Sequence, residues 1–132
     1  MGRGRRVLVV DDDADGREAM RALLELWGHE VEVAANGEQG VELTLNRRPE
    51  VVLLDIGMPG MDGYQVAERI RAAPGGRDPF LVALTGWATV EDHRRAREVG
   101  FDTYVLKPAD PEHLQALLAA APAADPKPDE LR

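Results

Sequence analysis

Five short apolar runs alternate with stretches of helical periodicity along the 132 residues of the chain. The runs are rich in β-branched residues, three of them are apolar throughout, and they lie at Val7–Val10, Val31–Ala34, Val51–Leu54, Phe80–Leu84 and Tyr104–Leu106. Parallel strands that are covered on both faces have this composition. From Met20 to Trp27, apolar residues recur at i, i+3, i+4 and i+7, the spacing of an amphipathic helix. The alternation predicts a single α/β domain with a doubly wound, five-stranded parallel sheet and five helices.

Residues that favour helix ends support these boundaries. Gly28 and Gly100 stand where a glycine is expected to end a helix. Helix starts are predicted where a capping residue has a suitable partner, at Asn36 with Gln39, at Thr89 with Asp92 and at Asp110 with Pro111. Segment 122–132 is proline-rich and lacks periodicity. We therefore expect a folded domain over residues 1–121 and a disordered tail or linker after it.

Composition narrows the classes of function. The formal net charge is −8, and so acidic a chain repels a phosphate backbone, which argues against direct binding of nucleic acid. The chain has no cysteine, which excludes disulfides, thiolate metal sites and cysteine nucleophiles. Neither a signal peptide nor a membrane-spanning segment is visible, so we expect a cytoplasmic protein without membrane contact.

Charged or hydroxyl side chains stand at the ends of four predicted strands. Asp11, Asp12 and Asp13 follow the first run, Asp55 ends the third, Thr85 ends the fourth, and Lys107 follows the fifth. Ligands of open α/β sheets bind at the edge where parallel strands have their carboxyl ends. Each residue alone is explained by a turn, a strand or a solvated surface, and for Asp13 we favour a helix cap. Together they predict a site where several carboxylates, a hydroxyl and an ammonium group converge.

A cluster of carboxylates needs a positive partner. Oxygen ligands that leave room for water suit Mg²⁺. A cation held by Asp11, Asp12 and Asp55 would position a phosphoryl donor for in-line attack by a carboxylate. Lys107 would pair with the phosphoryl oxygens, and the Thr85 hydroxyl would donate a hydrogen bond to another of them. The cluster therefore describes a phosphorylated aspartate with its ligands.

Four motifs in a fixed order carry a family resemblance. They are Val9–Asp12, Leu53–Gly63, Leu84–Gly86 and Tyr104–Pro108. On these motifs the chain resembles the receiver domain of bacterial two-component response regulators, over roughly residues 5–120. The resemblance implies a flavodoxin-like strand order, 2-1-3-4-5, and a cis peptide bond before Pro108.

The resemblance also implies a role for each site residue. Asp55 would accept a phosphoryl group and bind Mg²⁺ together with Asp12, with Asp11 acting through water and Gly57 through its backbone carbonyl. Thr85 and Tyr104 would form the switch that reshapes the surface around the fourth helix. The domain would catalyse its own phosphorylation and slow dephosphorylation without turning over a separate small substrate.

Three positions depart from the pattern of the family. Gly57 lacks the side chain that is often found there, although its carbonyl suffices for the metal. Trp87 either shields the acyl phosphate or lies partly buried in a loop, and these two interpretations carry equal weight. Ala109 replaces the aromatic residue that commonly follows the lysine-proline pair.

An aspartate-nucleophile phosphatase of the haloacid-dehalogenase type is the alternative function. It too has an Asp-x-Asp motif after an apolar strand, followed later by a threonine and a lysine. Against it, Asp15 stands where Thr or Val is expected, and no acidic pair follows Lys107. Turnover of a small phosphate ester would distinguish this enzyme from a receiver domain.

The expected partners are proteins. The phosphodonor would be a histidine kinase or a histidine phosphotransfer domain, and the output an unknown downstream protein; the resemblance also allows a homodimer. A free-standing regulator, which the length favours, and a domain of a hybrid kinase both remain open. Arg94, Arg95 and Arg97 mark either a docking surface for an acidic partner or, as we favour, a solvated helix face.

Overall fold

Strands and helices alternate in the computed structural model, which describes residues 4–75, 78–86 and 89–122. The elements are β1 (Arg6–Val10), α1 (Ala14–Leu26), β2 (Glu30–Ala34), α2 (Gly37–Arg47), β3 (Val51–Asp55), α3 (Gly63–Ala72), β4 (Phe80–Thr85), α4 (Val90–Val99), β5 (Thr103–Leu106) and α5 (Pro111–Ala120). The predicted alternation of five strands with five helices is confirmed.

The strands form one parallel sheet in the order β2-β1-β3-β4-β5, as the resemblance implied. The register pairs Val9 with Leu53 and Asp55 with Leu84, so β1, β3 and β4 end close to the same line across the sheet. At the far side, Thr85 pairs with Leu106 of β5. The carboxyl ends of four strands therefore share one edge, which is where the predicted site residues stand.

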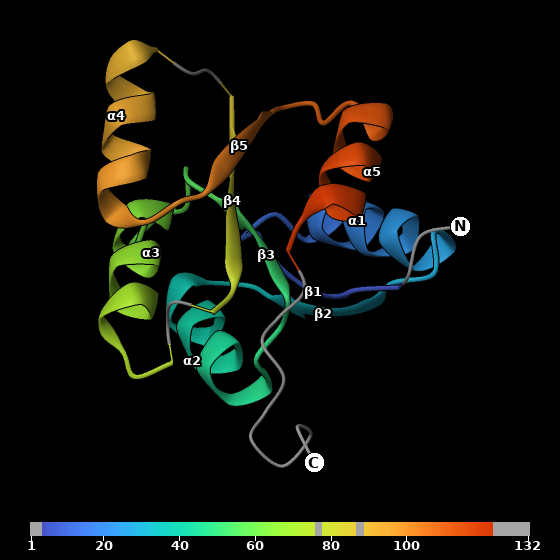
Figure 1. Cartoon of the computed structure of the whole chain (residues 1–132), viewed down its shortest axis with the longest axis horizontal. Helices are drawn as coiled ribbons and strands as arrows, with labels where there is room; N and C mark the ends of the chain where they lie inside the picture. The colour runs from blue at the N-terminus through green and yellow to red at the C-terminus, as the bar shows by residue number, and fades with distance from the viewer. Residues whose placement is uncertain (1–3, 76–77, 87–88, 123–132) are drawn as a thin grey trace.

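Two helical layers cover the sheet, with α2, α3 and α4 on one face and α1 and α5 on the other (Figure 1). Side chains alternate between the faces along each strand. In β1, Val7 and Val9 pack toward α1 and α5, whereas Leu8 and Val10 pack toward the three-helix layer. Because both faces are covered, the central strands can be apolar at every position, and this explains the continuous apolar runs.

Helix ends follow the capping residues. Gly28 and Gly100 have φ of +92° and +107° after α1 and α4, a conformation that glycine adopts without strain. The predicted caps of α4, Thr89 with Asp92, and of α5, Asp110 before Pro111, are confirmed. The cap of α2 differs in one bond: Asn36 accepts from the Gln39 amide, but the Gln39 side chain accepts from the amide of Ala35.

Two further expectations concern single features of the chain. The peptide bond between Lys107 and Pro108 is cis, as implied. The expected disordered tail falls on 122–132, of which 123–132 lie outside the residues that the structure describes, so that expectation stays a prediction. None of the described helices is long and apolar enough to cross a membrane.

Candidate functional site

Three carboxylates meet at the carboxyl edge of the sheet. Asp11 and Asp12 directly follow β1, and Asp55 is the last residue of β3. Their ligand oxygens all lie within 4.8 Å of one another. Asp11 and Asp55 are each only 7% exposed, whereas Asp12 is exposed. The fold therefore brings together the three acids that the sequence analysis singled out.

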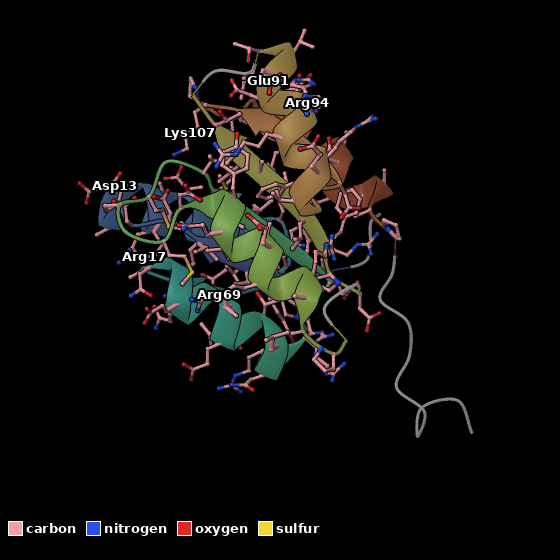
Figure 2. All side chains as sticks on the ribbon, turned by 90° about the vertical axis from the view of Figure 1, so that its left-hand side faces the viewer. Asp13, Arg17, Arg69, Glu91, Arg94 and Lys107 are labelled. Atoms are coloured by element: carbon pink, nitrogen blue, oxygen red, sulfur yellow. The ribbon has the colours of Figure 1, made fainter. Side chains whose placement is uncertain are left out.

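Both oxygens of the Asp55 carboxylate have a partner. The backbone N–H of Gly57 donates a hydrogen bond of 3.0 Å to Oδ1, and the ammonium nitrogen of Lys107 lies 3.1 Å from Oδ2. Lys107 is held in turn by its own N–H, which donates to the Thr85 carbonyl at 2.7 Å. Figure 2 shows Lys107 on the same side of the molecule as Asp13, in the loop after β1. Among the described side chains, the one cation paired with Asp55 is therefore Lys107, which directly follows β5.

Backbone contacts fix Asp11. Its N–H donates to the Ala34 carbonyl of β2 at 3.1 Å, and its Oδ1 accepts from the Asp13 amide at 3.0 Å. Burial raises the pKa of the Asp11 carboxyl, the Asp13 amide opposes this, and the nearby charge of Asp55 adds to it. Burial and the charge of Asp55 therefore disfavour the ionised form of Asp11, and a nearby cation would favour it. Asp13 itself caps α1 by accepting from the Gly16 amide, as expected for a helix cap.

Thr85 and Tyr104 line the same cavity, of about 110 Å³, between α4 and the ends of β4 and β5. Thr85 is the last residue of β4, and Tyr104 lies on β5 opposite Ala83. The Tyr104 ring contacts the ring of His93 on α4, with 4.0 Å between centroids and 60° between planes. The two predicted switch residues therefore line one cavity. The contact between Tyr104 and His93 was not predicted from the sequence.

The donor set fits a hard divalent cation. Mg²⁺ prefers oxygen ligands and binds through one or two carboxylates together with water. Among the residues that the structure describes, three carboxylates form the cluster and one cationic side chain, Lys107, pairs with it. One positive charge cannot balance three acids at this distance, so a bound cation relieves their repulsion. Asp11, Asp12 and Asp55 are the residues that could hold it.

The comparisons with known proteins identify the family. The model of the response regulator receiver domain matches residues 7–119. The chain belongs to this family. A 14.6 kDa protein of Leptolyngbya boryana is 39% identical over 112 residues, which are 85% of this chain and 86% of that protein. Response regulator MprA from Mycobacterium is 37% identical over 87% of this chain, and the match spans 49% of its own length.

Solved receiver structures resemble this one. The chemotaxis protein CheY4 of Vibrio cholerae has a TM-score of 0.85 and 28% identity, covering 91% of this chain and 100% of that one. The receiver domain of a sensor histidine kinase from Pseudomonas aeruginosa has a TM-score of 0.82 and 30% identity, covering 90% and 98%; that structure holds a magnesium ion in its active-site cleft. Family membership decides against the haloacid-dehalogenase alternative.

The three departures from the family pattern have different outcomes. Gly57 is exposed, and its amide donates a hydrogen bond to Asp55; the role of its carbonyl as a metal ligand stays a prediction. Ala109 is half-buried and packs against the core beneath α1 and α5. Trp87 lies outside the described residues, so shielding of the acyl phosphate and partial burial in a loop both stay predictions.

Two of the three arginines singled out on α4, Arg94 and Arg95, make contacts within the domain. Arg94 pairs with Glu91 and with Glu98, and Figure 2 shows Glu91 and Arg94 side by side. The guanidinium of Arg95 lies 4.0 Å from the centre of the Tyr64 ring. These contacts fit the solvated helix face that we favoured over a docking surface.

Proposed function

We propose that this receiver domain is a phosphorylation-dependent signalling switch whose phosphoacceptor is Asp55. One observation carries the proposal: Asp55 lies between the ammonium of Lys107, at 3.1 Å, and the carboxylates of Asp11 and Asp12. A lone buried acid would be costly without partners. An acid flanked by a cation and by a cation-binding pair is arranged to accept an anionic group.

The proposed reaction is transfer of a phosphoryl group from a phosphohistidine. A carboxylate oxygen of Asp55 attacks the phosphorus in line with the leaving imidazole. The oxygen–phosphorus bond forms as the phosphorus–nitrogen bond breaks, and the nitrogen keeps the electron pair and takes up a proton. Positioning and electrostatic stabilisation dominate such transfers. Reaction of the same acyl phosphate with water would return Asp55.

Each neighbour has a proposed task. Asp12 and Asp55 would hold Mg²⁺ directly, with Asp11 acting through water and the carbonyl of Gly57 completing the set. The ion supplies positive charge that neutralises the transferred group. Lys107, which is 39% exposed and already paired with Asp55, can turn its ammonium to a phosphoryl oxygen without leaving the site.

The proposed readout runs through the cavity beside α4. The Thr85 hydroxyl would move toward a phosphoryl oxygen and leave space at the end of β4. Tyr104 borders the same cavity, so its ring would turn inward and change its contact with His93 on α4. A local change at Asp55 would thereby alter the surface that α4 and β5 present.

The proposed partners follow from this chemistry. The phosphodonor is a histidine kinase or a histidine phosphotransfer domain, in the cytoplasm, and the output is a further protein; neither nucleic acid nor membrane is bound directly. The net charge of −8 supports this choice. We further propose that residues 1–121 form the receiver unit, because α5 ends at Ala120.

Intact-mass spectrometry after treatment with phosphoramidate and Mg²⁺ tests the proposal. We expect the wild type to gain one phosphoryl group, which hydroxylamine removes because the product is an acyl phosphate. Asp55→Asn should gain none. Asp15→Asn, which changes an exposed acid in the first turn of α1, should be labelled like the wild type. Equal labelling of Asp55→Asn would exclude Asp55 as the acceptor.

A further inference from the structure

The three acids of the cluster are not held equally. The Asp55 carboxylate has Gly57 and Lys107 as partners, and the Asp11 carboxylate has the Asp13 amide. In the part of the chain that the structure describes, the Asp12 carboxylate accepts no hydrogen bond, and it is exposed. Its place within 4.8 Å of the other two acids therefore depends on its backbone.

Arg17 holds the backbone that places Asp12. Its Nη1 donates a hydrogen bond of 2.9 Å to the carbonyl oxygen of Asp11. That carbonyl belongs to the peptide group that joins Asp11 to Asp12, so the bond fixes the orientation of the Asp12 backbone. Arg17 is half-buried in the first turns of α1, close to the loop that contains Asp13 (Figure 2).

The residues before and after the Asp11–Asp12 peptide group are held by other hydrogen bonds. Before it, the Asp11 N–H donates to Ala34 of β2. After it, Asp13 caps α1 through the Gly16 amide, and the Asp13 carbonyl accepts from the backbone N–H of Arg17. The side chain of Arg17 thus holds the remaining peptide group of the loop between β1 and α1, which is the one that leads into Asp12. Without it, mutual repulsion of the three carboxylates can turn Asp12 outward into solvent.

Arg17 acts on the site through geometry rather than through its charge. The contact of its guanidinium is a hydrogen bond to a neutral backbone carbonyl oxygen, at 2.9 Å from Nη1. A cationic side chain placed directly among the three carboxylates would repel a metal cation. The hydrogen bond of Arg17 ends instead on a backbone carbonyl.

We propose that Arg17 is a positioning residue: it presets the Asp11–Asp12 peptide so that Asp12 faces the place of the divalent cation before the cation arrives. The inference rests on the proposed function, because it gives Asp12 its role as a direct ligand. Groups that orient metal ligands in this way typically contribute about 10–100-fold to metal affinity.

Calorimetric titration with Mg²⁺, together with phosphorylation rates measured over a range of Mg²⁺ concentrations, tests the proposal. In Arg17→Met, which keeps the aliphatic stem but no donor, Mg²⁺ affinity should fall by roughly tenfold. The phosphorylation rate at saturating Mg²⁺ should stay near that of the wild type, because the cation itself then draws Asp12 into place. Arg17→Lys, which restores one donor, should recover part of the affinity.

Arg21→Met is the matched control. Arg21 lies one turn further along α1, and its partners are Glu18 and Glu25 on the same helix. Its removal should leave Mg²⁺ affinity unchanged. Thermal unfolding without metal confirms that each variant is folded, and Arg17→Gln serves as a second variant without a charge.

The outcomes separate this inference from the proposed function. If the wild type binds Mg²⁺, Asp12→Asn abolishes binding and Arg17→Met binds as tightly as the wild type, the positioning role is wrong and the proposed function stands. If the wild type itself binds no Mg²⁺, both are wrong. Failure of both Arg17→Met and Arg17→Gln to fold would also contradict the inference, since Arg17 would then serve the stability of the fold.

Discussion

Two glycines that follow Asp55, Gly57 in the turn after β3 and Gly63 at the start of α3, differ in the room around them. A Cβ atom at Gly63 would lie 2.7 Å from the Cα of Ile56 and 2.8 Å from the carbonyl oxygen of Asp55. A Cβ atom at Gly57 would meet only Oδ1 of Asp55, at 3.7 Å, which is ordinary contact. The start of α3 thus packs against the backbone of Asp55 and Ile56 at Gly63, whereas there is room for a side chain at Gly57.

Gly63→Ala should therefore lower the free energy of unfolding by about 1–3 kcal/mol, because backbone atoms cannot yield as a flexible side chain does. It should also slow phosphorylation, since Asp55 must shift with its peptide. Gly57→Ala should change stability by less than about 0.5 kcal/mol. Urea unfolding of both variants measures the difference, and equal stabilities would show that the backbone at Ile56 relaxes freely.

His29 couples stability to pH. Burial lowers its pKa from the ordinary 6.5, the charge of Arg5 lowers it further, and Glu50 opposes them. The neutral ring accepts a hydrogen bond of 2.9 Å from the Arg5 amide at Nδ1, which a protonated ring cannot do. Because the folded-state pKa lies below the unfolded value, the unfolded state binds more protons in between. The contribution of His29 is present above pH 6.5 and is lost as the pH falls through the folded-state pKa.

Urea unfolding between about pH 8 and pH 5 tests this coupling. The wild type should lose more stability on acidification than His29→Asn, whose amide oxygen can accept the Arg5 bond but does not titrate. His113→Asn alters an exposed histidine on α5 and should behave like the wild type. Parallel pH profiles for wild type and His29→Asn would contradict the coupling.

Among the elements, the start of β1 is tied to the end of α5. The Arg5 guanidinium donates to the carbonyls of Ala119 and Ala121, and its Nη1 lies 3.1 Å from Oε2 of Glu50. The last carbonyls of a helix have no hydrogen-bond partner within the helix, and a cation near them is favourable. Arg5 and Glu50 are 11% and 5% exposed, so the ion pair is buried. The contact closes the domain at the edge opposite the carboxylate cluster.

Glu50→Gln should cost about 3 kcal/mol of stability or more, because it leaves the Arg5 charge buried without its counterion. Glu32→Gln is the control, since Glu32 pairs with Arg47 at 3.7 Å on the surface and should contribute less than about 1 kcal/mol. Chemical unfolding at constant pH measures both. A loss in Glu50→Gln no larger than that in Glu32→Gln would mean that the buried pair is well hydrated.

At the scale of the whole molecule, the predictable parts were those that depend on the order of elements. Asp55 and Lys107 are about fifty residues apart, yet Asp55 ends one strand and Lys107 directly follows another, and parallel strands bring such ends together. The helix ends at Gly28 and Gly100 could also be predicted, because the positive φ that ends a helix depends on the glycine itself and not on distant contacts.

The contacts that escaped prediction depend on how a helix side chain meets a particular strand or loop. Arg17 reaching the Asp11 carbonyl, and His93 contacting Tyr104, are fixed by the rotation and tilt of α1 and α4 over the sheet. Periodicity shows which face of a helix is apolar, but it does not show which polar side chain at the rim of that face meets which atom. The Gln39 side chain, which bonds to Ala35 instead of Asn36, is a smaller case.

The proposed function requires that side chains from separate strand ends act as one phosphoryl-accepting site that depends on a divalent cation. The most direct measurement is the initial rate of phosphorylation by phosphoramidate, with Mg²⁺ and with a chelator, in the wild type, Asp12→Asn and Lys107→Met. We predict that the chelator abolishes labelling of the wild type, and that each substitution slows labelling with Mg²⁺ on the order of 100-fold. Wild-type rates in both variants, or labelling that persists with the chelator, would contradict the account.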